Sequence, residues 1–422
     1  MPIAENLPLT ARPPGAGPPA HARSSSWHYQ DHGLTTTRDL RIDFMRGFVF
    51  LLLFTAHFDY FSWLALIGWE RLGVVSSAET FIILAGVVTG AVYSKRLRRQ
   101  GLGAIIPALF SRAWTLYKIS FVVAASIALL RLIPGLHTEA LTRFTDPVTG
   151  LSYSLYPLAE KGFMYNLLHI LFLKAGPHQF QVVGLYVVLF LLTPVIFWAI
   201  ERGKVQTLLV LSWLGYVSNY FLPETQPGIA EIRLTGAQFE FAFPLLAWQL
   251  LFVHGVVAGY YRQEVLGFFA SAPGRVLVGV CVLLSLVLAF FSLNHPLDKL
   301  PDWATLSVIP PPVFDAWYQR FFLKYNLGPG RLLNNFVLLV SVYALLTVAW
   351  RPIHRALGWL FIPLGQESMY VFFVHIYLIL LIANTGLPQL GNAWINTAIH
   401  LGMLMLCWIM VKKKFLFHWA PH

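Results

Sequence analysis

The stretch that decides the fold runs from Asp43 to His57 and reads DFMRGFVFLLLFTAH. It belongs to the first of about ten apolar segments long enough to cross a bilayer as a helix, for which about 20 residues are needed. A central charge in such a segment costs roughly 2.5–3.5 kcal/mol on insertion scales, so Arg46 and the ionisable His57 indicate a protein interior or a watery cavity. We therefore predict an all-α, polytopic integral membrane protein, a helical bundle of about ten transmembrane helices.

The composition is that of a membrane protein and excludes an ordinary soluble one. Apolar residues make up 57% of the 422 residues, charged residues 12%, and the mean hydropathy is +0.63. Soluble domains carry about 25% charged residues. The net charge of +11 does not indicate nucleic-acid binding, because lysine and arginine fall at the ends of apolar segments. Cys281 and Cys407 lie within apolar runs without metal-ligand spacing, and we interpret them as small apolar fillers.

Three regions follow from the distribution of apolar residues. Residues 1–37, rich in Pro, Ala, Ser and Gly, are predicted to be a disordered cytoplasmic tail. Residues 38–414 form the transmembrane domain, and residues 415–422 a short cytoplasmic C-terminal tail. The segment 162–174 is too short to span, so we expect it at the interface or as a re-entrant piece. The predicted spans are 44–66, 72–94, 114–133, 180–200, 205–221, 242–261, 276–292, 333–350, 366–384 and 394–411.

Positive charge accumulates in alternate connections between these spans. The cluster from Lys95 to Arg99 and the run from Lys412 to Lys414 lie in two such connections, whereas residues 385–393 carry no positive charge. The positive-inside rule therefore places both termini in the cytoplasm. The larger external loops are then 134–161 and 293–330.

His57 and Glu79 are the first candidates for chemistry. His57 lies 13 residues beyond Phe44, about 20 Å along a helix, and Glu79 lies near the start of the next segment, which runs back inward. Adjacent packing of the two helices would bring them to similar depth. A carboxylate beside an imidazole fixes its tautomer, so the pair could activate a hydroxyl for attack on an acyl carbonyl. The alternative is a packed histidine bonded to a backbone carbonyl, with Glu79 near the headgroups.

The predicted inner side carries basic residues that could hold an anion. Arg98, Arg99 and Arg112 could bind the phosphates of a nucleotide-type acyl carrier such as coenzyme A, because guanidinium groups bind phosphate bidentately. Equally, they could be ordinary positive-inside charge. Asp43 and Arg46 are three residues apart and can form a local pair worth a few tenths of a kcal/mol, so an interfacial anchor is their simpler interpretation.

Other polar side chains lie at depths where lipid disfavours them. His375 lies inside the ninth segment, His178 and Gln179 precede the fourth, and Trp248 and Gln249 lie inside the sixth. Each could line a cavity, and a helix–helix hydrogen bond is the alternative for His375. No Walker loop, dinucleotide fingerprint, Gly-x-Ser-x-Gly elbow or His-Glu-x-x-His motif occurs, so we predict no metal site and no bound cofactor.

These residues resemble a known family of membrane enzymes. Asp43-x-x-Arg46-Gly47 followed by His57 resembles the first-helix signature of the acyltransferase-3 superfamily. Phe81–Gly86 and Leu364–His375 resemble its second-helix and late-helix patterns, although Ala85 replaces the usual serine. The superfamily often shows Arg-x-x-Arg where this chain has Leu109 and then Arg112. Within the superfamily the chain most resembles the OpgC family, through Ala78-Glu79-x-Phe81, Arg112-Ala113-Trp114-x-Leu116-Tyr117, Gly176-Pro177-His178-Gln179-Phe180, Gly184-Leu185-Tyr186-Val187-Val188, Ala247-Trp248-Gln249-Leu250-Leu251-Phe252 and Leu327-Gly328-Pro329-x-Arg331-Leu332-Leu333.

OpgC proteins are inner-membrane enzymes that succinylate osmoregulated periplasmic glucans. The resemblance therefore implies that residues 38–414 are an acyltransferase domain in the bacterial inner membrane. Its donor substrate would be an acyl-CoA, which the resemblance implies is succinyl-CoA, and its acceptor a periplasmic glucan or another polysaccharide. The resemblance makes His57 the catalytic histidine, oriented by Glu79, with Arg112, Arg98 and Arg99 binding the coenzyme A phosphates. The residues expected to contact substrate are Asp43, Arg46, His178, Gln179, Trp248, Gln249, Arg331 and His375.

Two other functions remain open from the sequence. In a proton-coupled transporter or flippase, His57, Glu79 and His375 would form a proton relay; the absence of a clear internal repeat lowers this possibility. A catalytically inactive relative, acting as an assembly component, is the second alternative, because Ala85 and Leu109 depart from the superfamily pattern.

Overall fold

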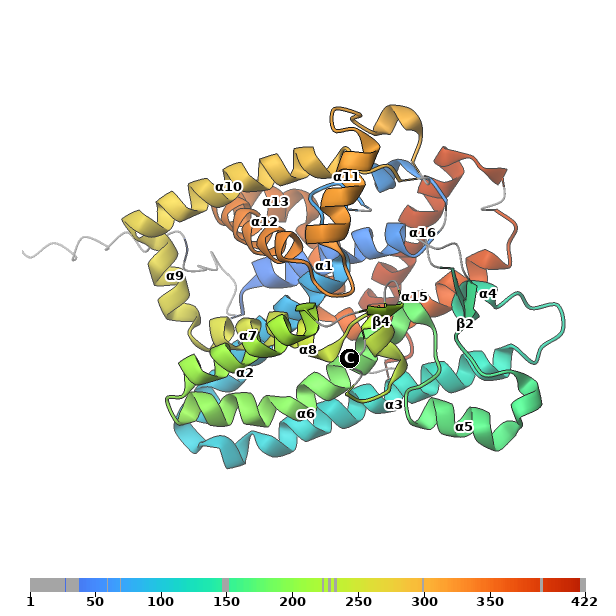
Figure 1. Ribbon diagram of the computed structural model, residues 1–422, viewed down its shortest axis with the longest axis horizontal. Helices are drawn as coiled ribbons and strands as arrows, with labels where there is room; N and C mark the ends of the chain where they lie inside the picture. Colours follow the sequence, from blue (N-terminus) through green and yellow to red (C-terminus); the bar gives the residue numbers. More distant parts are fainter. Residues whose placement is uncertain are drawn as a thin grey trace, which may run out of the picture.

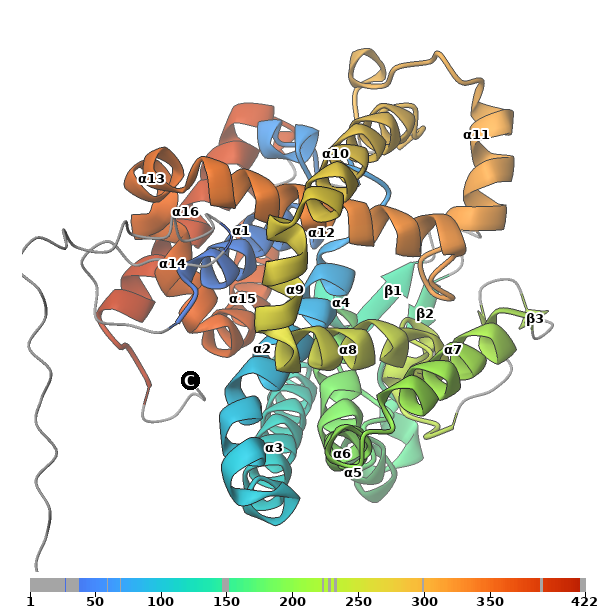
Figure 2. The same ribbon diagram turned by 90° about the vertical axis from the view of Figure 1, so that its left-hand side faces the viewer.

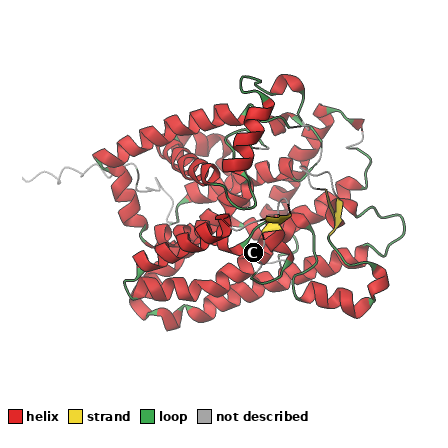
Figure 3. Ribbon diagram, viewed as in Figure 1, coloured by secondary structure: helices red, strands yellow, loops and turns green. Residues whose placement is uncertain are grey.

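The computed structural model describes residue 27 and residues 38–417, except residues 59, 69, 146–151, 222–223, 227–228, 231–233, 298–299 and 388–389. The described chain is mainly helical, with two small antiparallel strand pairs in its loops (Figure 3). The predicted all-α class is therefore confirmed. Most of the predicted N-terminal tail and the last residues of the C-terminal tail lie outside the described residues.

Ten long helices form the body of the protein: α1 (Leu40–Ala56), α2 (Ser77–Gln100), α3 (Ile106–Leu130), α6 (Gln181–Glu201), α7 (Val205–Phe221), α8 (Leu245–Tyr260), α10 (Ala272–Ser292), α12 (Pro329–Val348), α15 (Ser368–Ala383) and α16 (Ala393–Lys412). The shorter helices are α4 (Glu139–Thr142), α5 (Phe163–Leu171), α9 (Arg262–Ala270), α11 (Pro311–Trp317), α13 (Trp350–Ile353) and α14 (Trp359–Gln366). Short 3₁₀ or π turns are η1 (Trp63–Leu66), η2 (Leu102–Ala104), η3 (Ala159–Lys161), η4 (His178–Phe180), η5 (Gln238–Phe241), η6 (Asp302–Ala304), η7 (Tyr318–Phe322) and η8 (His354–Gly358). The strand pairs are β1 (Arg143–Thr145) with β2 (Ser152–Ser154), and β3 (Glu224–Gln226) with β4 (Ile229–Ala230).

Each of the ten predicted spans overlaps one of the long helices, but not all of these helices are of spanning length. Within the described chain, six helices are long and apolar enough to cross a membrane. The number rises to seven if the bent pair Trp350–Gln366 and Ser368–Ala383, which meet at 89°, is one span. A multi-pass membrane protein is supported, whereas the count of ten spans and the cytoplasmic position of both termini stay predictions.

The first helix is shorter than predicted, because it ends at Ala56 instead of continuing to residue 66. Side chains of α16 form hydrogen bonds with backbone groups of the chain that follows. Asn396 donates to Phe61 O at 2.7 Å, and the N–H of Trp63 donates to Thr397 Oγ1 at 2.9 Å. Backbone groups in a membrane protein need partners, and here side chains of another helix replace the helical ones.

Helices α2 and α8 approach closely because glycines face each other across the contact. A Cβ added at Gly90 would lie 2.1 Å from Val256 O, and one at Gly259 would lie 2.0 Å from Val87 O. The same relation holds one turn away for Gly86 and Gly255. Both helices thus carry the small-xxx-small spacing that allows helix backbones to touch in membranes.

Helix α1 lies inside the bundle, as the two perpendicular views show (Figures 1 and 2). It contacts α2, α14 and α16, and α14 crosses it at a second glycine pair, Gly47 with Gly365. Helices α3 and α6 lie side by side along the lower edge of Figure 1, and α10 packs on α12 along the upper edge. The two ends of α1, at Asp43 and His57, are therefore both packed against other helices.

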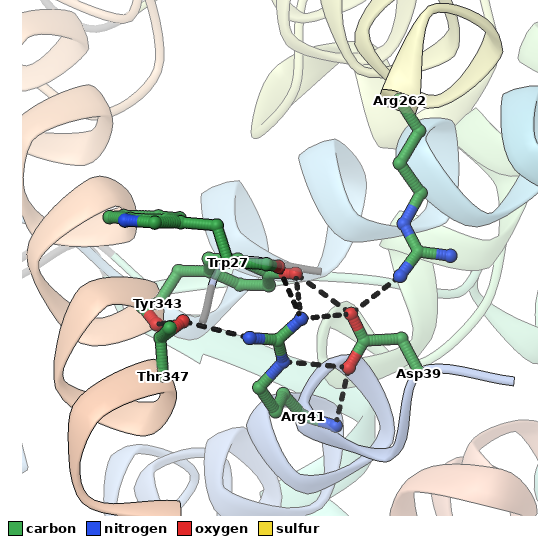
Figure 4. A network of polar contacts seen from close by, with 6 residues as sticks. All are labelled: Trp27, Asp39, Arg41, Arg262, Tyr343 and Thr347. Carbon is green, nitrogen blue, oxygen red and sulfur yellow. Dashed lines mark hydrogen bonds and ion pairs between the residues drawn. The ribbon is translucent and has the colours of Figure 1, made fainter. Parts of the chain in front are cut away.

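A polar network fixes the beginning of α1 (Figure 4). The Asp39 carboxylate accepts hydrogen bonds from Arg41 Nε at 3.0 Å, Arg262 Nη2 at 2.6 Å and Tyr343 Oη at 2.7 Å. Arg41 also donates to the carbonyl oxygen of Trp27, whose indole stacks on Tyr343. Trp27 is the one described residue of the predicted N-terminal tail, and it is buried.

Candidate active site

A pair of histidines lies at the C-terminal end of α1. His57 caps this helix, and its backbone N–H donates to Leu53 O at 3.1 Å. Its ring stacks on the ring of His375 in α15, with centroids 5.2 Å apart and planes 25° apart. The contacting atoms are His57 Nδ1 and His375 Nε2, separated by 3.0 Å. His375 is 1% exposed and His57 is half-buried, so one ring of the pair keeps accessible surface.

The surroundings of this pair are aromatic and basic. Phe54 stacks on His375 with ring centroids 5.9 Å apart. His178 of η4 and Lys324, in the loop before α12, lie close enough to act electrostatically on His57. The structure thus brings together three predicted site residues, the three histidines, from three distant segments. Lys324 was not predicted, because it lies in a long loop and belongs to no recognisable motif.

Glu79 does not take the predicted place beside His57. It is fully buried at the start of α2, where its Oε2 accepts from Ser76 N at 3.0 Å and its Oε1 from Arg331 Nη1 at 2.7 Å. Arg331, in α12, is fully buried as well and forms a second ion pair with Glu70 at 2.7 Å. A buried guanidinium without carboxylate partners is strongly destabilising, so Arg331 and its two glutamates form a self-contained unit. Sequence alone does not reveal this pairing, because 252 residues separate Glu79 from Arg331.

The same unit ties the loop after His57 to α12. Glu70 lies in this loop and was not predicted as a site residue. Burial alone would raise the pKa of Glu70, but the Arg331 guanidinium outweighs burial and holds that pKa below its ordinary value. Tyr318 Oη accepts from Arg331 Nη2 at 3.2 Å, which adds η7 to the same network. Arg331 therefore has a structural role around the site, and contact with substrate stays a prediction for it.

The N-terminal end of α1 carries a second cluster. Asp43 is bound bidentately by Arg38, at 2.6 and 2.7 Å, and lies 3.8 Å from Arg46. Arg46 donates to Ser368 Oγ at the beginning of α15 and keeps 17% of its side chain exposed. Arg112 lies within electrostatic range of Arg46. Two guanidinium groups from α1 and α3 thus share one region, and no carboxylate among the described ion pairs binds Arg112.

Arg98 and Arg99 lie in the last turn of α2. Arg98 rests over the ring of Tyr260, 4.7 Å from its centroid, and donates to its carbonyl oxygen at 3.4 Å. Arg99 lines an open depression of about 360 Å³ together with Lys95, Arg96 and Gln100. Arg96 and Arg112 both act electrostatically on Tyr93, so the depression and the Arg112 region are neighbours.

The remaining predicted substrate residues make contacts within the protein. Gln249 exchanges hydrogen bonds with Ser212, at 2.8 Å in each direction, and so links α8 to α7. Trp248 is fully buried and donates to Tyr325 O at 2.8 Å. Gln179 donates to Ala140 O at 2.7 Å. These contacts account for the three residues as parts of the framework, and substrate contact stays a prediction for them.

The apolar helices indicate a multi-pass membrane protein, and one of its helices carries a histidine pair at one end and a basic cluster at the other. The comparisons with known proteins give the family. Residues 38–419 match the profile of the OpgC protein family, and the chain belongs to it. No curated protein matches the chain. The resemblance drawn from the sequence is thereby confirmed, and membership in this family makes the protein a membrane acyltransferase.

Proposed function

We propose that this protein is an O-acyltransferase of the bacterial inner membrane, which transfers a succinyl group from cytoplasmic succinyl-CoA to a hydroxyl group of a periplasmic glucan. Membership in the OpgC family supports acyl transfer and the modification of a glucan. The identity of the acyl donor, the identity of the acceptor and the location in the bacterial inner membrane are our proposals. They agree with a protein that has a histidine pair at one end of α1 and a group of arginines at its other end.

The observation that carries the proposal is the arrangement of two polar clusters on α1. Arg46 and His57 are 11 residues apart, which is about 16 Å along a helix. An extended pantetheine arm has a length of this order. A donor whose phosphates lie at Arg46 and Arg112 can therefore present its thioester near His57. The acceptor hydroxyl reaches the same imidazole from the outer side.

The chemical step needs one base and no redox partner. The acceptor hydroxyl oxygen attacks the thioester carbonyl, and His57 takes the hydroxyl proton as general base. The new C–O ester bond forms, the C–S bond breaks, and the coenzyme A thiolate receives the proton from the His57 imidazolium. His178 and Lys324, which both act electrostatically on His57, favour the negative charge that develops on the carbonyl oxygen.

The test uses purified full-length protein, succinyl-CoA labelled in the succinyl group, and a linear or cyclic glucan. We expect an alkali-labile succinyl ester on the glucan with the unchanged protein. We expect a loss of at least about 100-fold with His57→Gln, because general-base catalysis contributes 10²–10⁴-fold. His254→Gln is the matched control, since His254 pairs with Trp213 on another face of the bundle at 3.1 Å.

The outcomes separate the functions that the sequence left open. An ester that forms equally well with His57→Gln would remove His57 from the reaction. Uptake of glucan or acyl compound into vesicles without ester formation would support a transporter instead. Ester formation from acetyl-CoA but not from succinyl-CoA would keep the acyltransferase and exclude the proposed donor.

A further inference from the structure

His375 makes two hydrogen-bond contacts whose directions are fixed by chemistry. Its Nδ1 lies 2.5 Å from the backbone oxygen of Phe372, and its Nε2 lies 3.0 Å from Nδ1 of His57. A carbonyl oxygen can only accept a hydrogen bond, so the proton of the neutral His375 ring must be on Nδ1. The other nitrogen of a neutral imidazole carries a lone pair. His375 Nε2 is therefore an acceptor.

The tautomer of His57 follows from that of His375. Two ring nitrogens 3.0 Å apart form a hydrogen bond only if one of them carries a proton, and His375 Nε2 carries none. The proton is consequently on His57 Nδ1, and the lone pair of a neutral His57 is on Nε2. The opposite arrangement would direct two lone pairs at each other in a buried place, at the cost of an unmade hydrogen bond.

The second ring nitrogen of His57, Nε2, can accept a proton from a substrate. Among the described residues, His57 Nε2 has no hydrogen-bond partner, and the half-buried ring keeps accessible surface. The other ring, His375, is 1% exposed and has both nitrogens engaged. The two histidines are thus not equivalent: one can meet a substrate and the other cannot.

We infer that His375 is a positioning residue that holds His57 in its Nδ1–H tautomer, so that Nε2 is the atom that takes the proton from the acceptor hydroxyl. The inference rests on the proposed function for its chemical meaning. In the step, Nε2 gains the hydroxyl proton while Nδ1–H remains bonded to His375. The resulting imidazolium is stabilised by a neutral acceptor, and the proton then leaves from Nε2 to the coenzyme A thiolate. A second imidazole thus does the work that Glu79 was expected to do.

The first test reads the tautomer directly and needs no substrate. Protein with ¹⁵N-labelled histidine is examined by NMR, and His57 among the 14 histidines is assigned by comparison with His57→Gln. We expect a protonated Nδ1 and an unprotonated Nε2 for His57. In His375→Phe, which keeps a planar ring and removes the acceptor, we expect a mixture of tautomers. A His57 ring protonated mainly on Nε2 in the unchanged protein would overturn the inference.

The second test is kinetic and uses a matched pair of substitutions. In His375→Gln the amide oxygen can accept from His57 Nδ1–H, whereas His375→Phe offers no acceptor. We expect kcat to fall about 100-fold or more in His375→Phe, with KM for the acyl donor within twofold, and to recover at least tenfold in His375→Gln. Equal activity of the two variants, with wild-type melting, would overturn the positioning role. If the unchanged protein transfers no acyl group, the proposed function fails, while the NMR result still decides the tautomer.

Discussion

Replacing Gly47 with alanine adds one methyl group at the point where α1 crosses α14. The new Cβ would lie 1.9 Å from Phe361 O, and on the opposite side of the crossing a Cβ at Gly365 would lie 1.7 Å from Asp43 O. Both obstacles are backbone atoms, which no side-chain rotation can remove. Ordinary van der Waals contact begins near 3.4 Å, so the two helices must separate by about 1.5 Å.

This separation would act on both polar clusters, because α1 carries Arg46 and His57. Their partners, Ser368 and His375, lie on α15, which is joined to α14 at the bend. A displacement of about 1 Å at a catalytic group can cost about 10²-fold in rate, and overpacking costs about 1–3 kcal/mol of stability. We expect Gly47→Ala to lose acyl transfer about 100-fold and to melt at a lower temperature.

The assays are transfer of labelled succinyl groups to glucan and thermal unfolding of the purified protein. Gly402→Ala is the control, since no heavy atom lies within 4 Å of the Cβ it would add to α16. We expect that variant to keep its activity and its melting temperature. If Gly47→Ala behaves like Gly402→Ala in both assays, the tight crossing does not hold the site in place and the reasoning is refuted.

Three further predictions concern the charged groups. Arg331→Met leaves the buried Glu79 and the half-buried Glu70 without a cation, so we expect a loss of about 3–5 kcal/mol in thermal or denaturant unfolding, against little change for the exposed Arg320→Met. Arg46→Gln and Arg112→Gln should each raise KM for the acyl-CoA donor about tenfold, because a hydrogen bond to a charged group contributes about 1.5–3 kcal/mol; an unchanged KM in both would show that the donor phosphates do not bind at Arg46 and Arg112. The pKa of Glu70 is lowered in the folded protein, so its stabilising effect is complete above the ordinary glutamate value of 4.5 and is lost as the pH falls through the lower folded value. Glu70→Gln should therefore show a weaker loss of melting temperature below pH 4.5 than the unchanged protein, and parallel curves would contradict the ion pair.

The sequence predicted the helices better than their partners. Every apolar segment chosen as a span overlaps a helix, because such segments need internally bonded backbone. The predicted end of the first helix was wrong, because Asn396 and Thr397 form hydrogen bonds with backbone groups that follow it. The sharp bend before Ser368 was not predicted: Pro363 and Gly365 lie just before it, but the predicted span began at residue 366 and left the preceding helix out. Local patterns carry no information about contacts from another helix.

In the site, too, the residues could be predicted from the sequence but their contacts could not. His57 and His375 were both singled out as ionisable groups at membrane depth, but their contact joins residues 318 apart in the chain. Depth along two adjacent helices favoured Glu79 as the partner of His57, and the buried Arg331 binds that carboxylate instead. Electrostatic demand decided the outcome: an arginine without exposure needs a carboxylate more than a neutral imidazole does.

The polar network around Asp39 has a consequence for how the chain is assembled during synthesis. Its partners Arg262 and Tyr343 follow 223 and 304 residues later in the chain. At about 5–20 residues per second, Tyr343 leaves the ribosome roughly 15 to 60 s after Asp39. During this delay Arg41, two residues away, already neutralises the carboxylate. The start of the first helix therefore carries no net charge from Asp39 and Arg41 while the rest of the chain is being made. The segments with Arg262 and Tyr343 complete the network after they have been translated.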